Sequence, residues 1–387
     1  MSPARRLYRP TWAEVDLSKI RKNLRRLRSK TRTDLMLVVK ADGYGHGAVA
    51  VSRAAERAGS VRWFGVSSVE EGVVLREAGI RKPILILGSL YPFESMVAAV
   101  RWGLTPTVAS LEAARLIARA ARRRRIDCHL KIDTGMGRIG VRRGAAAEIA
   151  AYLKRAPRVR LGGVYTHLSC ADSNAVFTRR QLKLFREALS SVETAAGLPR
   201  WIHAANSAAA LRFPESRFNL VRPGLAAYGL YPGFEPALEL KTKIVFTKNV
   251  AARTPISYGA LHHTRRRARI ATLPIGYGDG LPRRMSLKGG RPSVNARKCR
   301  LHTSSEGGRA AVLIRGRRCP IVGAMSMDMV MADITFVPGV RVGEEAVLIG
   351  RSGKARIGAE DLAKAAGTIP YEIVTALKAR VPRVYRR

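Results

Sequence analysis

The chain has 387 residues, enough for two domains with a large core, and its 47% hydrophobic content is typical of a globular protein. Seventy Lys and Arg against 28 Asp and Glu give a net charge of +42, which would attract nucleic acid, anionic lipid or acidic metabolites. However, the basic residues are spread along the chain, aromatic residues make up only 6%, and no nucleic-acid motif is present, so we expect no specific nucleic-acid partner.

Strand-like and helix-like runs alternate over the first 240 residues. The stretch LSKIRKNLRRLRSKT at residues 17–31 places apolar residues on one stripe of a helix. Eight strand-like runs follow: MLVVKA, RWFGVSS, PILILGS, LTPTVAS, CHLKIDTG, GGVYTHLS, WIHAANS and NLVRPGLAAYG. Each is followed by a helix or helix-like connection, which predicts an α/β fold, a closed (β/α)8 barrel of the TIM type over residues 12–240.

From about residue 241 the sequence pattern changes to short β-like runs separated by Gly and Pro turns. Examples are RIATLPIGYGDG, AAVLIRGRRCPIVG and EEAVLIG. We expect a mostly β second domain over residues 241–387, joined by residues 1–11, with one helix near AEDLAKAAG.

Several classes of protein are disfavoured by what the chain lacks. No window is apolar enough for a membrane helix, and no apolar segment follows the basic N-terminal residues. The four cysteines show neither metal-binding spacing nor a disulfide framework. We therefore expect a cytoplasmic protein with reduced thiols, no metal and no membrane partner.

The stretch LMLVVKADGYGHG reads as a buried strand that ends on Lys40 and is followed by glycines suited to tight turns. By itself, Lys40 is either a charge reaching solvent or a nucleophile that forms a Schiff base. Barrel enzymes react at the carboxyl ends of their strands. Those ends carry Lys40, Lys131 with Asp133, His167, Asn206 with Ser207, and Arg222 with Gly224.

Phosphate groups bind in barrels after strands seven and eight, where this chain has NSAA and RPG. A lysine nucleophile together with a phosphate cradle points to pyridoxal 5'-phosphate as the cofactor.

Nine motifs, in order, are LVVKADGYGHGA, KIDTGMGRIG, YTHLSCAD, AANSAA, VRPGLAAYGLYP, ISYG, IGYGDG, MSMDM and TIPYEI. With them the sequence resembles alanine racemase, the fold-type III pyridoxal-phosphate enzyme, over almost the full chain. The resemblance implies that Lys40 holds the cofactor and acts as the base on one face of the substrate. It implies cofactor contacts for Tyr44, Arg138, Asn206, Ser207, Arg222, Gly224 and Tyr371, with Arg138 at the phenolic oxygen and also near substrate, and Arg222 at the ring nitrogen.

Racemisation needs a second base, and the resemblance assigns it to Tyr258 in a homodimer with shared active sites. A tyrosine with a pKa near 10 becomes a better base beside cations, and His167 and Arg222 would be its neighbours. The partner subunit would also supply Met327 and Asp328 to the substrate and Tyr277 to the entrance. Lys131, carbamylated in many relatives, would position Arg138.

The sequence departs from the family pattern at two places. Ala324 in GAMSMDM stands where the family usually has an arginine that meets the carboxylate matching Asp172 in the substrate corridor. Asp172 would then be unpaired or be compensated by Arg283, and a wider or more acidic corridor would favour larger or basic amino acids. Residues 291–308 resemble a basic, polar insertion, which we expect to be a surface loop.

The leading interpretation is a racemase that interconverts L-alanine and D-alanine by two bases and supplies D-alanine for peptidoglycan. A racemase of broader specificity, for serine or basic amino acids, is the near alternative. Decarboxylases of the same fold type share the barrel and lysine but have no need of ISYG. The alternative of a different class is a non-catalytic, basic protein that binds nucleic acid or the cell envelope.

Overall fold

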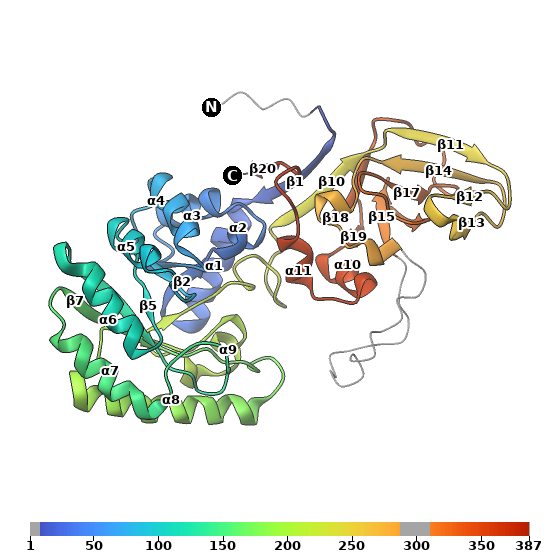
Figure 1. Cartoon of the computed structure of the whole chain (residues 1–387). Helices are drawn as coiled ribbons and strands as arrows, with labels where there is room; N and C mark the ends of the chain where they lie inside the picture. The colour runs from blue at the N-terminus through green and yellow to red at the C-terminus, as the bar shows by residue number, and fades with distance from the viewer. Residues whose placement is uncertain (1–7, 287–309, 387) are drawn as a thin grey trace. The chain divides into compact units, whose positions relative to one another are not determined.

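The computed structural model describes residues 8–286 and 310–386, and the chain divides into two compact units (Figure 1). Residues 17–235 form one unit, and residues 1–16 and 236–387 form the other. The sequence-based boundaries were residues 12 and 240. The 291–308 segment lies outside the described residues.

The first unit is the predicted barrel. Its eight strands are β2 (Asp34–Val38), β3 (Trp63–Val66), β4 (Ile84–Ile86), β5 (Thr107–Val108), β6 (Ile126–Lys131), β7 (Val159–Tyr165), β8 (Trp201–His203) and β9 (Leu220–Val221). Neighbouring strands pair in parallel through β2–β3–β4 and β5–β6–β7–β8. A Leu85–Thr105 bridge joins β4 to the segment before β5, and β2 pairs with β9. Backbone hydrogen bonds from Asn219 to Ile202 (3.4 Å) and from Arg222 to Ala205 (2.9 Å) join β9 to the β8 segment and complete the ring. The prediction of an α/β barrel followed by a mostly β domain is confirmed.

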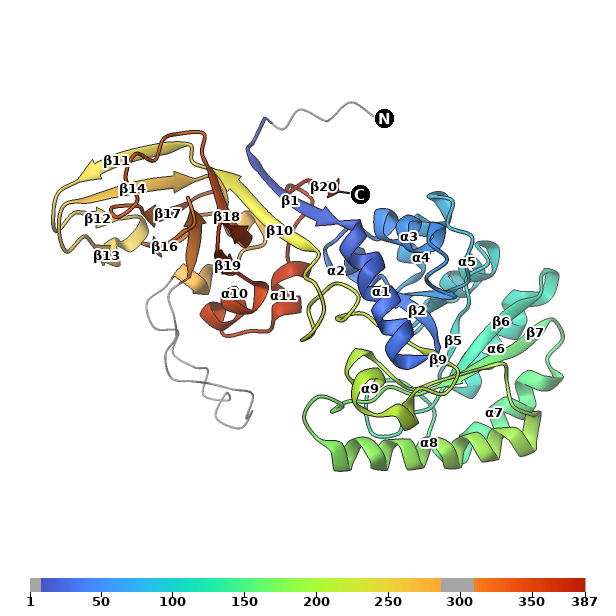
Figure 2. The same cartoon turned by 180° about the vertical axis from the view of Figure 1, so that it is seen from behind.

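Helices lie outside the strands of the barrel, as Figures 1 and 2 show. They are α1 (Leu17–Thr31), α2 (Lys40–Tyr44), α3 (Ala48–Arg57), α4 (Val69–Glu77), α5 (Phe93–Arg101), α6 (Leu111–Ala120), α7 (Arg143–Arg155), α8 (Ala175–Ala196) and α9 (Ser207–Arg212). In α1 the buried Ile20, Leu24 and Leu27 form the stripe expected from the sequence. No helix in residues 8–286 or 310–386 is long and apolar enough to cross a membrane.

Apolar and aromatic side chains from several strands form the core that supports the mouth of the barrel. Met36, Trp63, Leu85, Tyr165 and Leu220 form one buried cluster. Strands β3 and β4 are buried along their whole length, because parallel strands are covered on both faces. This closed core fixes the strand ends that carry the polar side chains.

The second unit is built on a ten-stranded sheet in the order β11-β14-β17-β16-β15-β18-β10-β1-β20, with β19 beside β18. Its strands are β1 (Thr11–Asp16), β10 (Leu238–Lys243), β11 (Phe246–Val250), β14 (Ala268–Leu273), β15 (Ala311–Ile314), β16 (Arg317–Val322), β17 (Val330–Asp333), β18 (Glu345–Ser352), β19 (Ala355–Ile357) and β20 (Arg383–Arg386). The hairpin β12 (Pro255–Ile256) and β13 (His262–His263) and the helices α10 (Ala359–Ala366) and α11 (Pro370–Thr375) complete the unit. The N-terminal strand β1 joins this unit between β10 and β20 and pairs with both, so neither of its edges is left open.

Candidate active site

Lys40 stands two residues beyond the end of β2, at the carboxyl end of the barrel, and opens an unusual turn. Ala41, Asp42, Gly43 and Tyr44 all have φ between 52° and 61°, so α2 is a left-handed turn rather than a right-handed helix. Three of these residues carry a Cβ, and each is therefore held in a costly conformation. Such strain is typical of functional segments.

Glu71 on α4 holds this turn in place. One carboxylate oxygen accepts a hydrogen bond from the Ala41 amide at 2.7 Å, and the other accepts from the Ser67 amide at 2.6 Å. The Asp42 side chain accepts from the Ala48 amide at 2.8 Å at the start of α3. These bonds tether the residues after Lys40 to the neighbouring β3–α4 unit and to the start of α3.

Four cations converge on this end of the barrel. Burial lowers the pKa of Lys40, the charge of Arg138 lowers it further, and the charge of Glu71 opposes both. Burial, followed by the charges of Arg138 and Arg222, lowers the pKa of Lys131 to about 8. Both lysines therefore have a larger neutral fraction at neutral pH than an exposed lysine.

His167, two residues beyond β7, belongs to the same group. Burial and then the charges of Arg222, Arg138, Lys131 and Lys40 lower its pKa to about 3. Its imidazole is thus neutral at physiological pH. A cluster of this charge suits an anionic ligand.

Arg222 follows β9 and is buried like Lys131, with 4% of its surface exposed. Its guanidinium donates to the carbonyl oxygens of Thr166 (2.6 Å), His203 (2.9 Å) and Ala204 (3.0 Å). Burial lowers the pKa of Arg222 to about 10, which still leaves it charged at neutral pH. Within the described residues it has no carboxylate partner, so its charge is unbalanced by the chain itself.

A line of hydrogen bonds runs from Arg222 into the barrel core. Arg222 donates to His203 Nδ1 at 2.8 Å, and His203 Nε2 lies 3.0 Å from His129 Nδ1. Because Arg222 can only donate, His203 carries its proton on Nε2 and donates it to His129. Tyr165 stacks on His203, with ring centroids 4.8 Å apart, and its ring also faces the guanidinium at 5.2 Å.

The loops after β8 and β9 and the left-handed turn after β2 form a small polar cradle. The Ser207 hydroxyl accepts hydrogen bonds from the amides of Gly224 (3.1 Å) and Ala226 (3.2 Å). A Cβ on Gly224 would lie 2.7 Å from the Tyr44 hydroxyl, so glycine is required for this close approach. Tyr44 in turn stacks on the buried Tyr228, with centroids 5.1 Å apart.

Other predicted residues of the barrel unit have visible structural partners. Asn206 caps α9 by accepting from the Ala209 amide, and its side-chain amide donates to the Leu168 carbonyl. Asp133 accepts from the amides of residues 135–137 and so caps a turn. Arg138 is exposed just beyond this turn, and Asp172 is exposed after β7.

The remaining predicted site residues belong to the β-rich unit. Tyr258 is 70% exposed in a tight turn between β12 and β13, where Ser257 and Ala260 have positive φ. The Ser257 hydroxyl donates to the Ala324 carbonyl at 2.6 Å, which links this turn to the segment of Met327. The others with substantial exposure are Tyr277, Arg283, Met327, Asp328 and Tyr371.

Two family models cover nearly all of this chain. The model described as alanine racemase, N-terminal domain, matches residues 15–232, and the model of the C-terminal domain matches residues 237–385. The chain belongs to the alanine racemase family. Curated relatives and solved structures agree with this assignment over nearly their full lengths.

The alanine racemase of Symbiobacterium thermophilum is 44% identical over 389 residues, covering 97% of both chains. That of Sorangium cellulosum is 39% identical over 98% of this chain and 99% of the relative. The crystal structure of alanine racemase from Streptomyces lavendulae has a TM-score of 0.88 at 35% identity, covering 99% of this chain and 98% of that one. A Bacillus anthracis alanine racemase with bound L-Ala-P has a TM-score of 0.87 at 35% identity, covering 99% and 96%. The chain is an isomerase, an amino-acid racemase that acts on alanine.

Sequence reasoning missed the residues behind the predicted site. Glu71, His129, Tyr165, His203 and Tyr228 lie against the predicted residues or their immediate neighbours. Tyr165 and Tyr228 fall within the motifs YTHLSCAD and VRPGLAAYGLYP but were given no role, and the other three lie outside the nine motifs. For Tyr165 the available signal was its place at the end of β7, two positions before His167 in the same motif. Cavities of about 730 and 870 Å³ are lined by arginine-rich surfaces around Arg25 and Arg317. Lys40 lines neither of them, so they are separate from the candidate active site.

Proposed function

We propose that the chain interconverts L-alanine and D-alanine with pyridoxal 5'-phosphate, using Lys40 and Tyr258 of the partner subunit as the two bases. The observation that carries the proposal is the convergence of Lys40, Lys131 and Arg222 beside a Ser207–Gly224 cradle at one barrel mouth. A buried lysine of lowered pKa is suited to react with an aldehyde, and the unbalanced guanidinium and the cradle suit an anionic, phosphate-bearing group.

The residues present fit this cofactor. Lys40 would hold it covalently, while Tyr44, Asn206, Ser207 and Gly224 would surround the phosphate, joined by Tyr371. Arg222 would face the ring nitrogen and Arg138 the phenolic oxygen. When bound, the cofactor withdraws electrons from the substrate Cα and so makes the Cα–H bond acidic.

The roles of the other side chains follow from charge. Arg222 donates hydrogen bonds without giving up its proton, because its pKa of about 10 is well above neutrality. The charge of Arg222 would favour an anionic phenolate on the second base, whereas His167, expected from the sequence to be a second cation there, is neutral and adds no charge. Lys40 moves the proton on one face of the substrate, and the tyrosine moves it on the other face.

Lys131 is suited to carry the carbamate that many relatives have. Carbamylation joins the neutral amine to the carbon of carbon dioxide and releases one proton, which leaves a carbamate anion on the side chain. A pKa of about 8 supplies the neutral amine at physiological pH. The resulting negative charge would sit among cations and orient Arg138.

A homodimer is supported by exposed side chains around the proposed second base. Tyr258, Leu261, Met327 and Met329 are between 45% and 70% exposed, and the Ser257–Ala324 hydrogen bond joins the two segments that carry them. A group of exposed apolar and aromatic residues is typical of an interaction surface. It would place Tyr258, Met327, Asp328 and Tyr277 at the partner's barrel.

Mixing two inactive variants tests the shared site directly. In a dimer of Lys40→Ala with Tyr258→Phe, one shared site has both wild-type bases and the other has neither. Statistical mixing after refolding should therefore restore about a quarter of the wild-type racemase activity, because about half of the dimers are mixed. If each subunit forms its own complete site, every site carries one lesion and mixing restores nothing.

Loss of the Cα–H signal of L-alanine in D2O, followed by proton NMR, measures the reaction itself. D-Alanine should accumulate on a chiral column, and Lys40→Ala should abolish both signals. Absence of exchange with the wild-type holoenzyme would refute the proposed function.

Broader specificity remains the second candidate because Ala324 replaces the usual arginine of the corridor. Ala324 is buried, and Asp172 is exposed with a Ser173 hydroxyl 3.3 Å from its carboxylate. Exchange of lysine, arginine or serine in the same NMR assay would support it, whereas exchange of alanine alone would exclude it.

We place the reaction in the cytoplasm and its product in the synthesis of peptidoglycan, as the resemblance implies. Expression of the chain in a bacterium that lacks its own alanine racemase should remove the requirement for D-alanine. Growth that still depends on added D-alanine, despite active protein in the extract, would contradict this role.

A further inference from the structure

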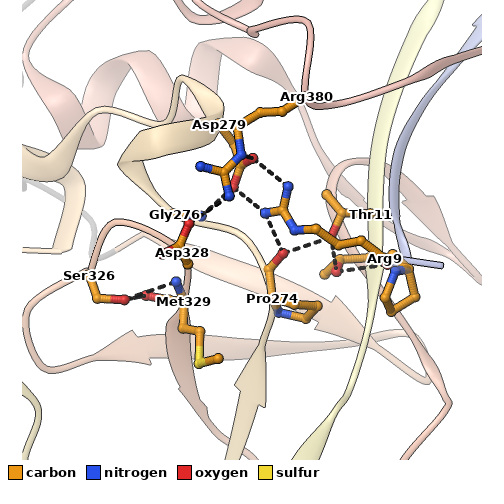
Figure 3. Close-up of polar contacts among 11 residues, drawn as sticks. Arg9, Thr11, Pro274, Gly276, Asp279, Ser326, Asp328, Met329 and Arg380 are labelled. Atoms are coloured by element: carbon orange, nitrogen blue, oxygen red, sulfur yellow. Dashed lines mark hydrogen bonds and ion pairs between the residues drawn. The ribbon is translucent and has the colours of Figure 1, made fainter. Parts of the chain in front are cut away.

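The β-rich unit contains a buried carboxylate that is shared by two arginines. The Asp279 side chain has no exposed surface, and Arg9 binds both of its oxygens, at 2.7 and 2.5 Å (Figure 3). Arg380 Nε lies 3.0 Å from the same carboxylate, and the Gly276 amide donates to it at 2.9 Å. Arg380 also donates to Asp328 at 2.6 Å. We call Arg9, Asp279, Arg380 and Asp328 the Asp279 network.

The Asp279 network ends on the segment that the proposed function gives to the substrate. Arg380 bridges two carboxylates, of which Asp279 is fully buried and Asp328 is 53% exposed. Arg9 arrives from the segment before β1, and its second contact is the Pro274 carbonyl at 2.7 Å, at the end of β14. The network therefore connects the N-terminal and C-terminal segments of the chain to two loops, residues 274–280 and residues 324–329, which we call the loop pair.

The two loops of this pair are in direct backbone contact. The Tyr277 amide donates to the Ser326 carbonyl at 3.2 Å, and the Gly278 amide donates to the Met327 carbonyl at 2.8 Å. A Cβ on Gly276 would lie 2.3 Å from the Ser326 carbonyl oxygen, so the IGYGDG sequence needs glycine for close approach here. The position of Met327 and Asp328 thus depends on the turn that Asp279 closes.

The charge of Asp328 explains why the bridge matters. An unpaired carboxylate next to Met327 would repel the carboxylate of an incoming amino acid, since both are anions. Pairing with Arg380 neutralises Asp328 and draws its side chain toward the buried Asp279. The arrangement favours an anionic substrate group over this loop.

We propose that the Asp279 network is a positioning device that holds Asp328 paired through Arg380 and fixes the 324–329 segment for recognition of the substrate carboxylate. The inference rests on the proposed function in one respect, namely that Met327 and Asp328 face the substrate. Asp279, Arg9 and Arg380 are positioning residues, because each acts through the loop pair.

Arg380→Gln is the main test, since Arg380 is 41% exposed and its replacement leaves the Arg9–Asp279 pair in place. The KM for alanine should rise about tenfold, with kcat changed less than about twofold, as for a lost charge interaction between neighbours. Arg380→Lys should recover only part of the loss, because one ammonium bridges two carboxylates poorly. Arg356→Gln, which removes an exposed pair with Glu360 in the same unit, is the matched control and should leave KM unchanged.

The Asp328→Asn substitution separates repulsion from simple damage. In the Arg380→Gln background it should lower KM again, to the value of Asp328→Asn alone, because the repelling charge has been removed. Additive increases in KM would overturn the inference.

Amide hydrogen exchange of the holoenzyme gives a readout that is independent of activity. In Arg380→Gln the peptides covering residues 274–280 and 324–330 should exchange faster, while those of the barrel and of the Arg356→Gln control stay as in the wild type. Unchanged exchange would overturn the inference whether or not the protein racemises alanine. If Arg380→Gln speeds exchange as expected but the wild-type protein does not racemise alanine, only the proposed function is refuted. If Arg380→Gln speeds exchange but leaves the KM for alanine unchanged, the role of the network in substrate recognition is refuted.

Discussion

Acid should destabilise the barrel through the two fully buried histidines, His129 and His203, and through His167, because all three are held in the neutral form. His129 and His203 have no exposed surface, and burial lowers the pKa of His129 to about 3 and that of His203 well below its usual value. In the unfolded chain all three return to a pKa of about 6.5. The unfolded state therefore binds more protons below pH 6.5, so stability is complete above that pH and falls between pH 6.5 and about 3.

The size of the effect follows from linkage. Each such histidine changes the free energy of unfolding by about 1.4 kcal/mol per pH unit inside this window. Between pH 6.5 and 5.0 the three together should cost about 5 kcal/mol, a large part of the usual stability of a domain, because the full slope is reached only below pH 6.5. The range stops at pH 5.0 because carboxylates titrate below it.

Urea unfolding of the holoenzyme at a series of pH values measures this slope. Fluorescence of Trp63 reports on the right region, since its ring packs against His129 with centroids 5.0 Å apart. His129→Asn keeps an acceptor for the His203 N–H and removes one of three titrating groups, so the slope should fall by about a third. The exposed His263→Gln is the control and should leave the slope unchanged. A flat free energy between pH 6.5 and 5.0, or an unaltered slope in His129→Asn, would refute the reasoning.

Three further predictions concern the proposed site. Gly224→Ala should weaken pyridoxal-phosphate binding more than about tenfold, because the new Cβ would collide with the Tyr44 hydroxyl. The control Gly144→Ala places its Cβ in open space on α7 and should leave binding unchanged, and equilibrium dialysis measures both variants. In bicarbonate buffer, native mass spectra should show that Lys131 gains the mass of one carbon dioxide, more completely at pH 8 than at pH 6. If this added mass is absent at both pH values, Lys131 is not carbamylated. Glu71→Gln should shift uptake of pyridoxal phosphate by the apoprotein to lower pH, because the lost charge raised the pKa of Lys40; an unchanged pH midpoint would contradict this.

The periodicity of the sequence predicted the architecture because strands buried on both faces appear as continuous apolar runs and amphipathic helices as apolar stripes. Strands such as β3 and β4 are short apolar runs, and α1 has the same bounds as the predicted stripe, Leu17–Thr31. The N-terminal strand β1 was expected to join the second unit, and its pairing with β10 confirms this. The small elements β12, β13, β19 and β20 were not predicted, since two to four residues carry too little pattern.

Motifs identified candidates for the site but not the groups that tune them. The left-handed turn after Lys40 includes Ala41 and Asp42, residues whose identity gives no sign of positive φ, and only the glycines suggested a turn. Glu71 is thirty positions away from the amide it binds, so no local pattern connects the two. His203 and His129 come from different strands, and only the closed ring of the barrel brings them together.

The two units accommodate buried charge in different ways. Arg222 in the barrel is satisfied by carbonyls and imidazoles and has no described carboxylate partner, so its full charge is available to a ligand. Asp279 and Asp328 in the β-rich unit are together balanced by Arg9 and Arg380 of the same chain, so no charge is left over for a ligand. A buried ion with an incomplete set of counter-charges indicates a binding site, whereas one with a complete set indicates positioning. On this reasoning the cofactor belongs to the barrel, and the β-rich unit contributes loops whose geometry must already be fixed.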